Sequence, residues 1–335
     1  MDIIVEIGNS HEGSLGIATS FIKMAKNTGA NCVKFQMHLA EFEGMNNEPF
    51  RESFSSQDSS RQEYWKRVNF TFENWKKLAK YASEQQLEFL CTPFSLEAAS
   101  WLSQEKLVRR WKVGSGDATN YPLIDYLIST KLPLIISTGL ISWQEIIDLK
   151  SRLVKKSAWE RTTLMHCISK YPTKIEESSL NLISDLKSLG CKVGLSDHSG
   201  NWRVPLKAIS MGIETLEIHM KPHDDFFGPD VASSLTPDMI ERIVETEKQW
   251  KIIDDNKGDK EIIFEQSSMN RKIFRKGIYW SNDKSVGEIV KFEDFKYRKP
   301  VVDLDASEFE KYIGKRIAQP VSRDSPVVKA DLDES

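Results

Sequence analysis

Short apolar runs alternate with longer amphipathic segments from the start of this 335-residue chain to about residue 253. The short runs are rich in β-branched residues, and the longer ones carry apolar residues at helical spacing, as parallel βα units do. Eight such units over roughly 250 residues are what a closed barrel needs. The predicted fold class is therefore α/β, a (β/α)8 TIM barrel followed by a small β-rich module. The predicted strands are Ile3–Ile7, Cys32–Gln36, Glu88–Thr92, Arg110–Val113, Leu134–Ser137, Thr163–Cys167, Lys192–Ser196 and Thr215–His219.

The helical pattern divides the chain into a barrel, a linker and a C-terminal module. The amphipathic segments include Leu15–Asn27, Glu73–Gln85, Trp143–Val154, Leu180–Leu189 and a last helix from Pro237 to Ile253. A stretch rich in Asp, Asn, Lys and Gly follows, and such composition marks a boundary. We expect the barrel at 1–255, a linker at 256–270 and the module at 271–335. The module's short strand or turn pieces are Lys272–Trp280, Glu288–Phe295 and Val327–Leu332. So small a module is expected to pack on the barrel or on a second subunit.

One long insertion, His38–Asn69, follows the second predicted strand. It is polar and contains the segment Tyr64–Arg67. A loop of this length on the catalytic rim of a barrel is usually functional. We therefore expect the insertion to be a lid or a binding wall.

Composition excludes several classes of partner. The formal net charge of −3 leaves no basic surplus to attract nucleic acid or an anionic membrane. The segment Met1–Glu6 has no basic or long apolar stretch, so no signal peptide is expected and the predicted location is cytoplasmic. The four cysteines lie in or beside strand-like runs without metal-ligand spacing. Buried free thiols are favoured over disulfides.

Two histidines close neighbouring strand-like runs, His198 after Gly194–Asp197 and His219 after Leu216–Ile218. The carboxyl ends of parallel strands meet at one rim of a barrel, so two imidazoles placed there can share one divalent cation. The pair predicts a metal-assisted enzyme. His11 and His166 also lie near strand ends, where each orients a neighbour or touches a ligand. His38 and His223 have no supporting motif and are predicted to be solvated loop residues.

Nearly every predicted strand ends in a polar or ionisable side chain. Two lysines and several hydroxyls on one rim suit a phosphate and a carboxylate on a small substrate. The glycine-containing turns 114–116 and 137–139 let backbone N–H groups approach the same anion. A lysine on this rim is also compatible with a Schiff base, as in aldolases. The rim residues are Glu6, Lys34, Gln36, Thr92, Lys112, Ser115, Asp117, Ser137, His166, Ser196, His198 and His219.

The order of several motifs resembles the sialic acid synthase family, whose members condense phosphoenolpyruvate with N-acylated hexosamines to give nonulosonic acids. The resemblance covers nearly the whole chain, and its tail, 271–332, resembles that family's antifreeze-like domain. The motifs together are specific, whereas any one alone is weak. They are Glu6–Gly13, Val33–Gln36, Cys91–Phe94, Lys112–Asn120, Ser137–Gly139, His166–Cys167, Tyr171–Thr173, Gly194–Ser199, Glu217–His219 and Gly228–Asp230.

The resemblance implies a reaction and a role for most rim residues. The expected sugar is N-acetylmannosamine or a related 2,4-diacetamido sugar, and the expected product is of the N-acetylneuraminate or legionaminate type. A divalent metal, Mn²⁺, Mg²⁺ or Co²⁺, would be held by His198 and His219 and would polarise the sugar aldehyde while C3 of phosphoenolpyruvate attacks it. Glu6, Lys112 and Asp117 are the expected catalytic residues, and Lys112 also contacts phosphoenolpyruvate. The expected substrate-binding residues are Lys34, Gln36, Thr92, Ser115, Ser137, Tyr171, Ser196, Asp230 and Lys299.

The sequence departs from the family pattern at three positions. Ser10 stands where the family has Asn, and Asp117 stands where it has the longer Glu. In the tail, Lys299 stands at the position of a substrate-contacting Arg, with Arg298 beside it. A lysine makes one point contact where an arginine makes a fork, so recognition of the N-acyl group is expected to differ.

The resemblance also implies a domain-swapped homodimer, in which Lys299 acts on the substrate of the other chain. Two alternatives stand beside the synthase. One is a Schiff-base aldolase or lyase, which needs no metal, and the other is a non-catalytic paralogue that binds a sugar phosphate. Retention of both histidines and both lysines argues against the non-catalytic reading.

Overall fold

The structure, a computed structural model, describes residues 1–335 except 46–47, 49, 51–53, 56 and 334–335. The chain divides into two compact units, Met1–Ile252 and Ile253–Ser335. Among the described residues, no helix is long and apolar enough to cross a membrane. All four cysteines are free thiols.

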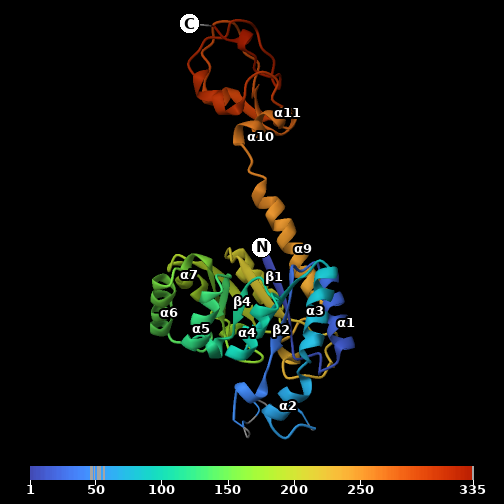
Figure 1. The fold of residues 1–335 in the computed structure, drawn as a ribbon. Helices are drawn as coiled ribbons and strands as arrows, with labels where there is room; N and C mark the ends of the chain where they lie inside the picture. The colour runs from blue at the N-terminus through green and yellow to red at the C-terminus, as the bar shows by residue number, and fades with distance from the viewer. Residues whose placement is uncertain (46–47, 49, 51–53, 56, 334–335) are drawn as a thin grey trace. The chain divides into compact units, whose positions relative to one another are not determined.

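The first unit is built on a parallel sheet that curls into a barrel (Figure 1). Its strands follow the order β3-β2-β1-β8-β7-β6-β5-β4, and the end strands β3 and β4 also lie in contact. The predicted (β/α)8 fold is thus confirmed. The described strands of this sheet are β1 Asp2–Gly8, β2 Cys32–Met37, β3 Glu88–Pro93, β4 Trp111–Val113, β5 Leu134–Ser137, β6 Thr162–Cys167, β7 Lys192–Asp197 and β8 Thr215–His219.

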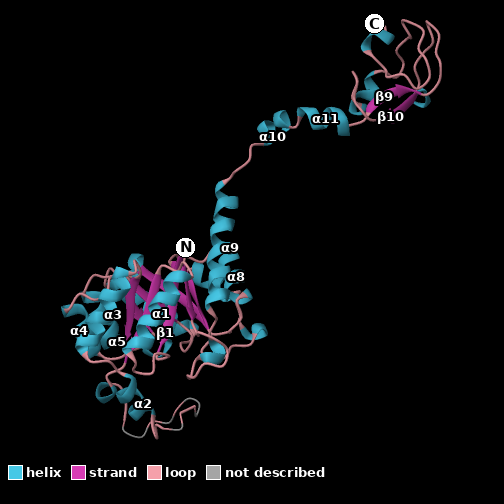
Figure 2. Cartoon of the chain, turned by 90° about the vertical axis from the view of Figure 1, so that its right-hand side faces the viewer, coloured by secondary structure: helices cyan, strands magenta, loops and turns pink. Residues whose placement is uncertain are grey.

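Helices surround the barrel (Figure 2). Side-chain caps explain where several of them begin. For example, the Ser142 hydroxyl accepts from the Glu145 N–H, and the Glu145 carboxylate accepts in return from the Ser142 backbone. The helices of this unit are α1 Leu15–Asn27, α2 Arg61–Val68, α3 Phe72–Glu84, α4 Leu96–Gln104, α5 Tyr121–Ser129, α6 Trp143–Lys155, α7 Leu182–Lys187, α8 Arg203–Ser210 and α9 Pro237–Asp255, which runs past residue 252.

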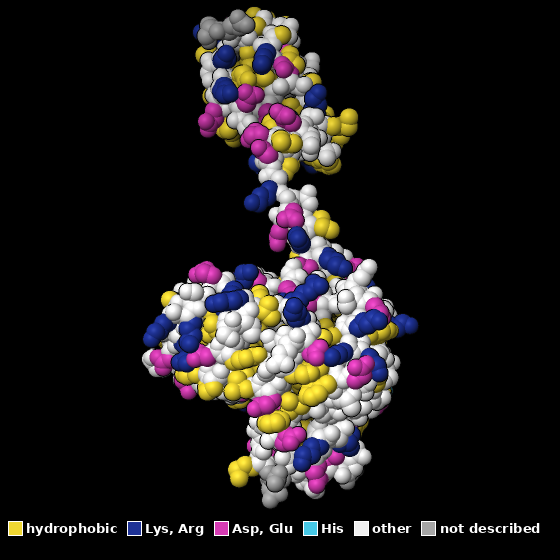
Figure 3. Space-filling model, viewed as in Figure 1, with side chains coloured by type: hydrophobic (Ala, Val, Ile, Leu, Met, Phe, Trp, Pro, Cys, Tyr) yellow, Lys and Arg dark blue, Asp and Glu magenta, His cyan; other side chains and the backbone are white. Residues whose placement is uncertain are grey.

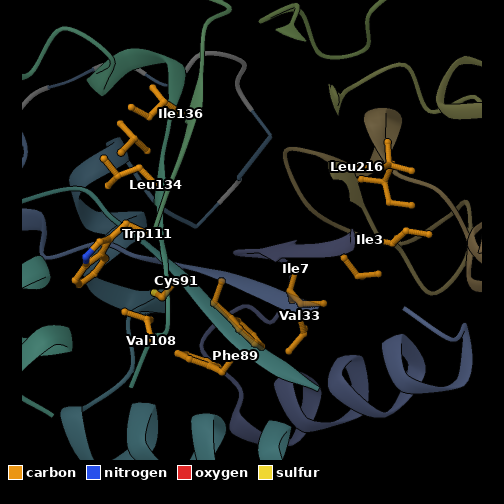
Figure 4. Packing of buried hydrophobic residues seen from close by; sticks show 14 of the residues in the cluster. Ile3, Ile7, Val33, Phe89, Cys91, Val108, Trp111, Leu134, Ile136 and Leu216 are labelled. Carbon is orange, nitrogen blue, oxygen red and sulfur yellow. The ribbon is translucent and has the colours of Figure 1, made fainter. Parts of the chain in front are cut away.

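Successive side chains along each strand point to opposite faces of the sheet, which gives the barrel an outer and an inner core. One set of side chains points outward and packs against the helices, as Ile3, Val33 and Leu134 do in Figure 4. The other set points into the barrel, where an apolar layer fills the interior. That layer consists of Ile4, Cys32, Leu90, Ile135 and Met165. Two residues further along β1, β2, β3 and β5, the same face carries polar side chains instead.

One glycine is required inside the barrel. A Cβ atom on Gly194 would collide with the Met165 sulfur and with the Thr215 carbonyl oxygen. Any larger residue at position 194 would push apart the apolar layer on which the polar layer rests.

The second unit is a small β-containing module with its own core. Strands β9 Gly277–Trp280 and β10 Phe295–Arg298 pair antiparallel. Ile278, Trp280, Leu304 and Val327 pack in a cluster that includes the strand pair. Two short helices, α10 Lys260–Gln266 and α11 Ser268–Phe274, precede β9. The range expected as a linker, 256–270, therefore contains helix, and the prediction of a strand or turn from Lys272 is wrong up to Phe274.

Lys and Arg side chains are interspersed with Asp and Glu over the face shown in Figure 3. This mixture agrees with the small net charge of −3. Among the described residues visible on this face, charges of the two signs alternate rather than forming one extended region of a single sign.

Candidate active site

The barrel strands surround a cavity of about 520 Å³. Most of its polar lining comes from the carboxyl ends of the strands, the position where barrel enzymes place their active sites. The insertion and the loop after β8 provide the remaining wall. The sequence-predicted site residues found in the lining are Glu6, Lys34, Gln36, Thr92, Lys112, Ser115, Ser137, Tyr171, Ser196, His198, His219 and Asp230.

A buried charge network occupies the floor of the cavity. Lys34 Nζ lies 2.8 Å from Glu6 Oε2 and 3.4 Å from Glu217 Oε1. Lys112 Nζ lies 3.7 Å from the same Glu217 oxygen and donates to Ser137 Oγ at 2.8 Å. Glu217 is therefore shared between two lysines, neither of which could stay charged here without a counter-ion.

Hydroxyl groups extend this network around the floor. Lys34 Nζ donates to Thr92 Oγ1 at 3.2 Å, and Ser196 Oγ donates to Glu217 Oε1 at 3.2 Å. Ser115 Oγ accepts from the Gly139 N–H at 3.0 Å, which ties the two glycine-containing turns together. The arrangement places ammonium groups and hydroxyls around one space, as an anion site requires.

Burial and charge act differently on the two lysines. Burial lowers the pKa of Lys34, but the carboxylates of Glu217 and Glu6 outweigh it and raise that pKa above its usual value. Burial lowers the pKa of Lys112 more than Glu217 raises it, and Lys34 lowers it further. Burial raises the pKa of Glu217, yet Lys112 and Lys34 bring it down to about 2. Lys34 is thus firmly cationic, whereas Lys112 gives up its proton more readily.

The two predicted metal ligands lie together at one side of the cavity. The ring centroids of His198 and His219 are 5.0 Å apart, and both histidines are buried. Tyr171 packs against His198 with centroids 4.2 Å apart. Cys167 Sγ lies 3.8 Å from His198 Nδ1, and Asp230 Oδ2 lies 3.8 Å from His219 Nδ1.

These residues fit a divalent cation with open coordination positions. Burial, together with the neighbouring His219, lowers the pKa of His198 to about 3, so its imidazole is neutral and able to donate a lone pair. Within the described residues, no group of three or more His, Cys, Asp or Glu side chains could close around an ion. A cation bound here would thus complete its shell with oxygen from water or substrate.

Glu6, Gln36 and Asp230 converge at the first strand. Gln36 Nε2 donates to Glu6 Oε1 at 2.7 Å. Gly8 adopts φ +56°, and a Cβ there would lie 3.5 to 3.6 Å from polar atoms of all three side chains. The turn at Gly8 thus leaves a compact polar corner between the charge network and the histidines.

Some predicted residues lie elsewhere. Asp117 ends a short 3-10 turn, where Asn120 Nδ2 donates to its Oδ1 at 3.0 Å, and it is absent from the cavity lining. Burial raises the pKa of Asp117. Ser10 is buried but is not part of the described lining. Lys299 belongs to the second unit, where its Nζ lies 5.2 Å from the Phe274 ring centroid.

The remaining histidines differ in their surroundings. The prediction that His38 is solvated is wrong, because it is 5% exposed and lines the cavity. His223 is exposed, as predicted. His166 is buried, with Nε2 2.8 Å from the Ser178 carbonyl oxygen. His11 is buried too, and its Nδ1 accepts from the Gly13 N–H at 3.1 Å.

Sequence reasoning missed two parts of the site. The rim prediction omitted Glu217, although it lies two residues before His219 and therefore faces the same interior. It also omitted the aromatic side of the cavity, which includes Phe94 and Trp65. Strand alternation was the signal available for Glu217. The aromatic wall depends on how the insertion folds back, for which no short-range pattern exists.

Comparison with known proteins agrees with this geometry. Residues 21–259 match the NeuB family. N,N'-diacetyllegionaminic acid synthase of Campylobacter jejuni is 29% identical over 321 residues, covering 93% of this chain and 94% of that protein. Human N-acetylneuraminate-9-phosphate synthase is 29% identical over 247 residues, covering 72% and 68%. The crystal structure of N-acetylneuraminic acid (sialic acid) synthetase from Leptospira borgpetersenii, in complex with citrate, superimposes with a TM-score of 0.68 at 27% identity, covering 80% and 90%.

Proposed function

The chain belongs to the NeuB family, and from that premise we propose that it condenses phosphoenolpyruvate with an N-acylated hexosamine and releases phosphate. The product would be a nonulosonic acid, the class of compound that appears in the names of the similar synthases. The observation that carries the proposal is the pair of buried lysines sharing Glu217, set beside two histidines in one cavity. That combination provides an anion site and a carbonyl-activating site within reach of one small substrate pair.

Phosphoenolpyruvate would bind at the floor. Lys34 and Lys112 would face its phosphate and carboxylate, and hydroxyls would supply the remaining hydrogen bonds. An anion bound between the lysines would share them with Glu217 and Glu6, the carboxylates that lie beside them in the structure. The proposed hydroxyl donors are Thr92, Ser115, Ser137 and Ser196.

His198 and His219 would hold Mn²⁺, Mg²⁺ or Co²⁺. The ion, when bound, polarises the aldehyde oxygen of the open-chain sugar. Tyr171 packs on the His198 ring and restrains its orientation. Asp230 lies beside His219 Nδ1 and favours the tautomer whose Nε2 lone pair is free for an ion.

The bond changes proposed are a condensation followed by loss of phosphate. C3 of phosphoenolpyruvate forms a bond to the aldehyde carbon, whose oxygen becomes a hydroxyl by taking a proton. Water adds at C2, and phosphate leaves as its bond to C2 breaks, giving the C2 carbonyl. Glu6, within 2.8 Å of Lys34, and Asp117 are the carboxyl groups proposed to move these protons. Asp117 would have to enter the cavity from its turn, because it is outside the described lining. Burial raises its pKa, which favours the protonated form that can donate.

The second unit is proposed to complete the site from a partner chain. It resembles an antifreeze-like domain, and Lys299 occupies the position of a substrate-contacting arginine. Its helices expose large apolar side chains, such as Ile262 at 55% and Met269 at 74%, which favours a partner surface. We propose a homodimer of a biosynthetic enzyme acting in the cytoplasm.

The test is phosphate release from phosphoenolpyruvate with a panel of N-acyl hexosamines. We expect release that requires both substrates and a divalent ion. A borohydride arm with pyruvate distinguishes the Schiff-base alternative, because a covalent adduct on Lys34 or Lys112 would contradict the proposal. If no sugar leads to release of phosphate, the result would favour a binding protein without this activity.

A further inference from the structure

A chain of hydrogen bonds runs from the insertion to the first strand. Glu43 Oε2 lies 2.7 Å from His38 Nδ1, and His38 Nε2 lies 3.1 Å from Gln36 Oε1. Gln36 Nε2 then donates to Glu6 Oε1 at 2.7 Å. His38 and Glu43 have no role in the proposed chemistry, yet this chain links them to a proposed catalytic carboxyl group. What His38 does there depends on which of its ring nitrogens carry hydrogen.

The orientation of the Gln36 amide is set from the Glu6 side. Glu6 Oε2 lies 2.8 Å from the ammonium group of Lys34, so Glu6 is an ionised carboxylate that can only accept hydrogen bonds. Its Oε1 atom therefore requires the NH2 group of Gln36, and the carbonyl oxygen of Gln36 must face His38. Since a carbonyl oxygen has no hydrogen to donate, His38 Nε2 must carry one.

The Glu43 carboxylate requires a hydrogen on the other ring nitrogen. Its Oε1 atom accepts from the Leu39 N–H at 2.6 Å, and its Oε2 atom faces His38 Nδ1. Two lone pairs at 2.7 Å would repel, so a hydrogen must lie between Oε2 and Nδ1. Imidazole is a stronger base than a carboxylate, so this hydrogen belongs to the ring. His38 therefore satisfies both partners as an imidazolium ion that Glu43 balances.

The surroundings of His38 suit a cation. Its ring lies between those of Phe94 and Trp65, with centroids 4.3 and 4.5 Å away and interplanar angles of 12° and 8°. The faces of aromatic rings attract a cation at this distance. His38 is 5% exposed, so the two rings and Glu43 replace most of its water. Because both faces of the imidazole are covered, its two nitrogens keep their partners.

The other charged and titratable groups around His38 come from three further segments. His11, in the loop after β1, is neutral, because burial and the neighbouring His38 lower its pKa to about 3. Burial raises the pKa of Asp117, in the turn after β4, and Glu43 adds to the rise while His38 opposes it. Arg61, which lies on the tryptophan of the stack, is 44% exposed, so water screens its charge. Among the described residues, Glu43 is thus the counter-ion in direct contact with the His38 ring.

The fixed amide decides what Gln36 offers to the cavity. Its nitrogen carries two hydrogens, one of which Glu6 uses, and lies 3.5 Å from the position of a Cβ on Gly8. Asp230 Oδ2 lies 3.6 Å from the same position, and Gln36 and Asp230 both line the cavity. With its carbonyl turned to His38, Gln36 presents a second N–H in this corner, suited to a hydroxyl or carbonyl oxygen. A flipped amide would set its oxygen against the Glu6 carboxylate and leave both acceptors unsatisfied.

We propose that His38, held as an imidazolium by Glu43, is a positioning residue for Gln36 and Glu6. It acts through the Gln36 amide, which it holds with one N–H on the Glu6 carboxylate and the other toward the sugar. The identity of the ligand rests on the proposed function, whereas the protonation of His38 does not depend on it.

NMR of the full-length protein, labelled with ¹⁵N in histidine and glutamine, tests these hydrogen bonds without a ligand. At about pH 7.5, where a free histidine is mostly neutral, both His38 nitrogens should show the signature of a protonated nitrogen. The spectrum of His38→Phe identifies their signals. In Glu43→Gln, the new amide can donate to Nδ1 while its oxygen accepts from Leu39, so Nδ1 should lose its hydrogen and Nε2 should keep it. In His38→Phe, the released Gln36 amide should exchange with solvent at least about 10-fold faster than in wild type.

Sugar affinity tests the positioning role. Calorimetry is performed with N-acetylmannosamine and with a 2,4-diacetamido hexose, and affinity for the sugar that binds wild type should fall about 10- to 100-fold in His38→Phe. Affinity for phosphoenolpyruvate should change less than about twofold, because Lys34 and Lys112 stay in place. In a Gln36→Leu background, His38→Phe should add less than about twofold, because the group through which it acts is gone. His223→Phe, at an exposed histidine outside the described lining, is the matched control and should bind as wild type.

A His38 nitrogen without hydrogen in the wild-type protein at this pH would overturn the proposal. So would an unchanged exchange rate of the Gln36 amide in His38→Phe, equal losses of affinity for sugar and phosphoenolpyruvate, or a full further loss in the Gln36→Leu background. If neither sugar binds wild type, or if no sugar leads to release of phosphate, the proposed function fails. The two NMR readouts then still decide whether His38 is charged and whether it holds Gln36.

Discussion

At the scale of single residues, Glu217 sets the charge of the two lysines beside it. Its Oε1 atom lies within 3.7 Å of both ammonium groups. Burial lowers the pKa of Lys112, and Glu217 is the main group that opposes this. A lysine that loses its proton can no longer pair with a phosphate or carboxylate. Binding of phosphoenolpyruvate should therefore weaken as pH rises, below the range in which a free lysine titrates.

Glu217→Gln should move that alkaline limb to lower pH. Without the carboxylate, the pKa of Lys112 falls further, by about one to three units. The KM for phosphoenolpyruvate, measured as a function of pH, reports the change. Glu214→Gln, an exposed residue at the entry to β8, is the control and should leave the profile in place. An alkaline limb that stays where it is in Glu217→Gln would show that Lys112 is not the titrating group.

The histidine pair makes a second prediction at this scale. Loss of an outer contact to a metal-binding histidine typically weakens metal affinity about 10- to 100-fold, so loss of a direct ligand should cost at least as much. We expect Mn²⁺ affinity, measured by calorimetry, to fall by at least about 100-fold in His198→Ala. Chelation should abolish activity and added Mn²⁺, Co²⁺ or Mg²⁺ should restore it. His223→Ala, an exposed histidine, should behave as wild type. Wild-type Mn²⁺ affinity in His198→Ala would refute the assignment.

At the scale of elements, the sequence predicts the barrel strands to within one residue at each end. Strands buried on both faces read as continuous apolar runs, such as Leu134–Ser137, so their limits are visible without the fold. The rim is predictable for the same reason. Helices α10 and α11 are not, because their surroundings are rich in charge and their apolar side chains remain exposed. The stacked rings of Phe94, His38 and Trp65 could not be predicted either, because their side chains come from the ends of two strands and from one helix.

Arg67 makes one ion pair within the insertion and one to the loop after β1. Arg67 Nη2 donates to Asp58 Oδ2 at 2.8 Å and to Glu12 Oε2 at 2.9 Å. The Arg67 hydrogen bonds hold the pKa of Asp58 below its usual value. Because the folded pKa is the lower one, the stabilisation is present above the unfolded value of about 3.9 and is lost as pH falls through the folded pKa.

Asp58→Asn should therefore loosen the insertion at neutral pH. Hydrogen exchange of the α2 amides at pH 7 should be faster than in wild type, and the difference should disappear as pH falls through the lowered folded pKa of Asp58. Glu73→Gln, on the exposed start of α3, serves as the control. Equal α2 exchange in Asp58→Asn and wild type at pH 7 would show that this pair does not hold the insertion.

At the scale of the whole molecule, the proposed dimer makes each site depend on two chains. Full-length Lys112→Ala loses the barrel's own lysine, and full-length Lys299→Ala loses the group contributed by the second unit. Mixed dimers would contain one site with both lysines intact. Random exchange of two inactive proteins should therefore restore about a quarter of wild-type activity. With exchange verified by mass spectrometry, a mixture as inactive as its components would exclude the arrangement in trans.

The most direct measurement follows the bridging oxygen of phosphoenolpyruvate through the reaction. Substrate labelled with ¹⁸O between C2 and phosphorus is incubated with an N-acyl hexosamine and a divalent ion, and both products are analysed by mass spectrometry. The account predicts equal amounts of a nonulosonic acid and of phosphate, with the label in the phosphate. Label retained in the organic product, phosphate formed without sugar, or no phosphate with any sugar would contradict it.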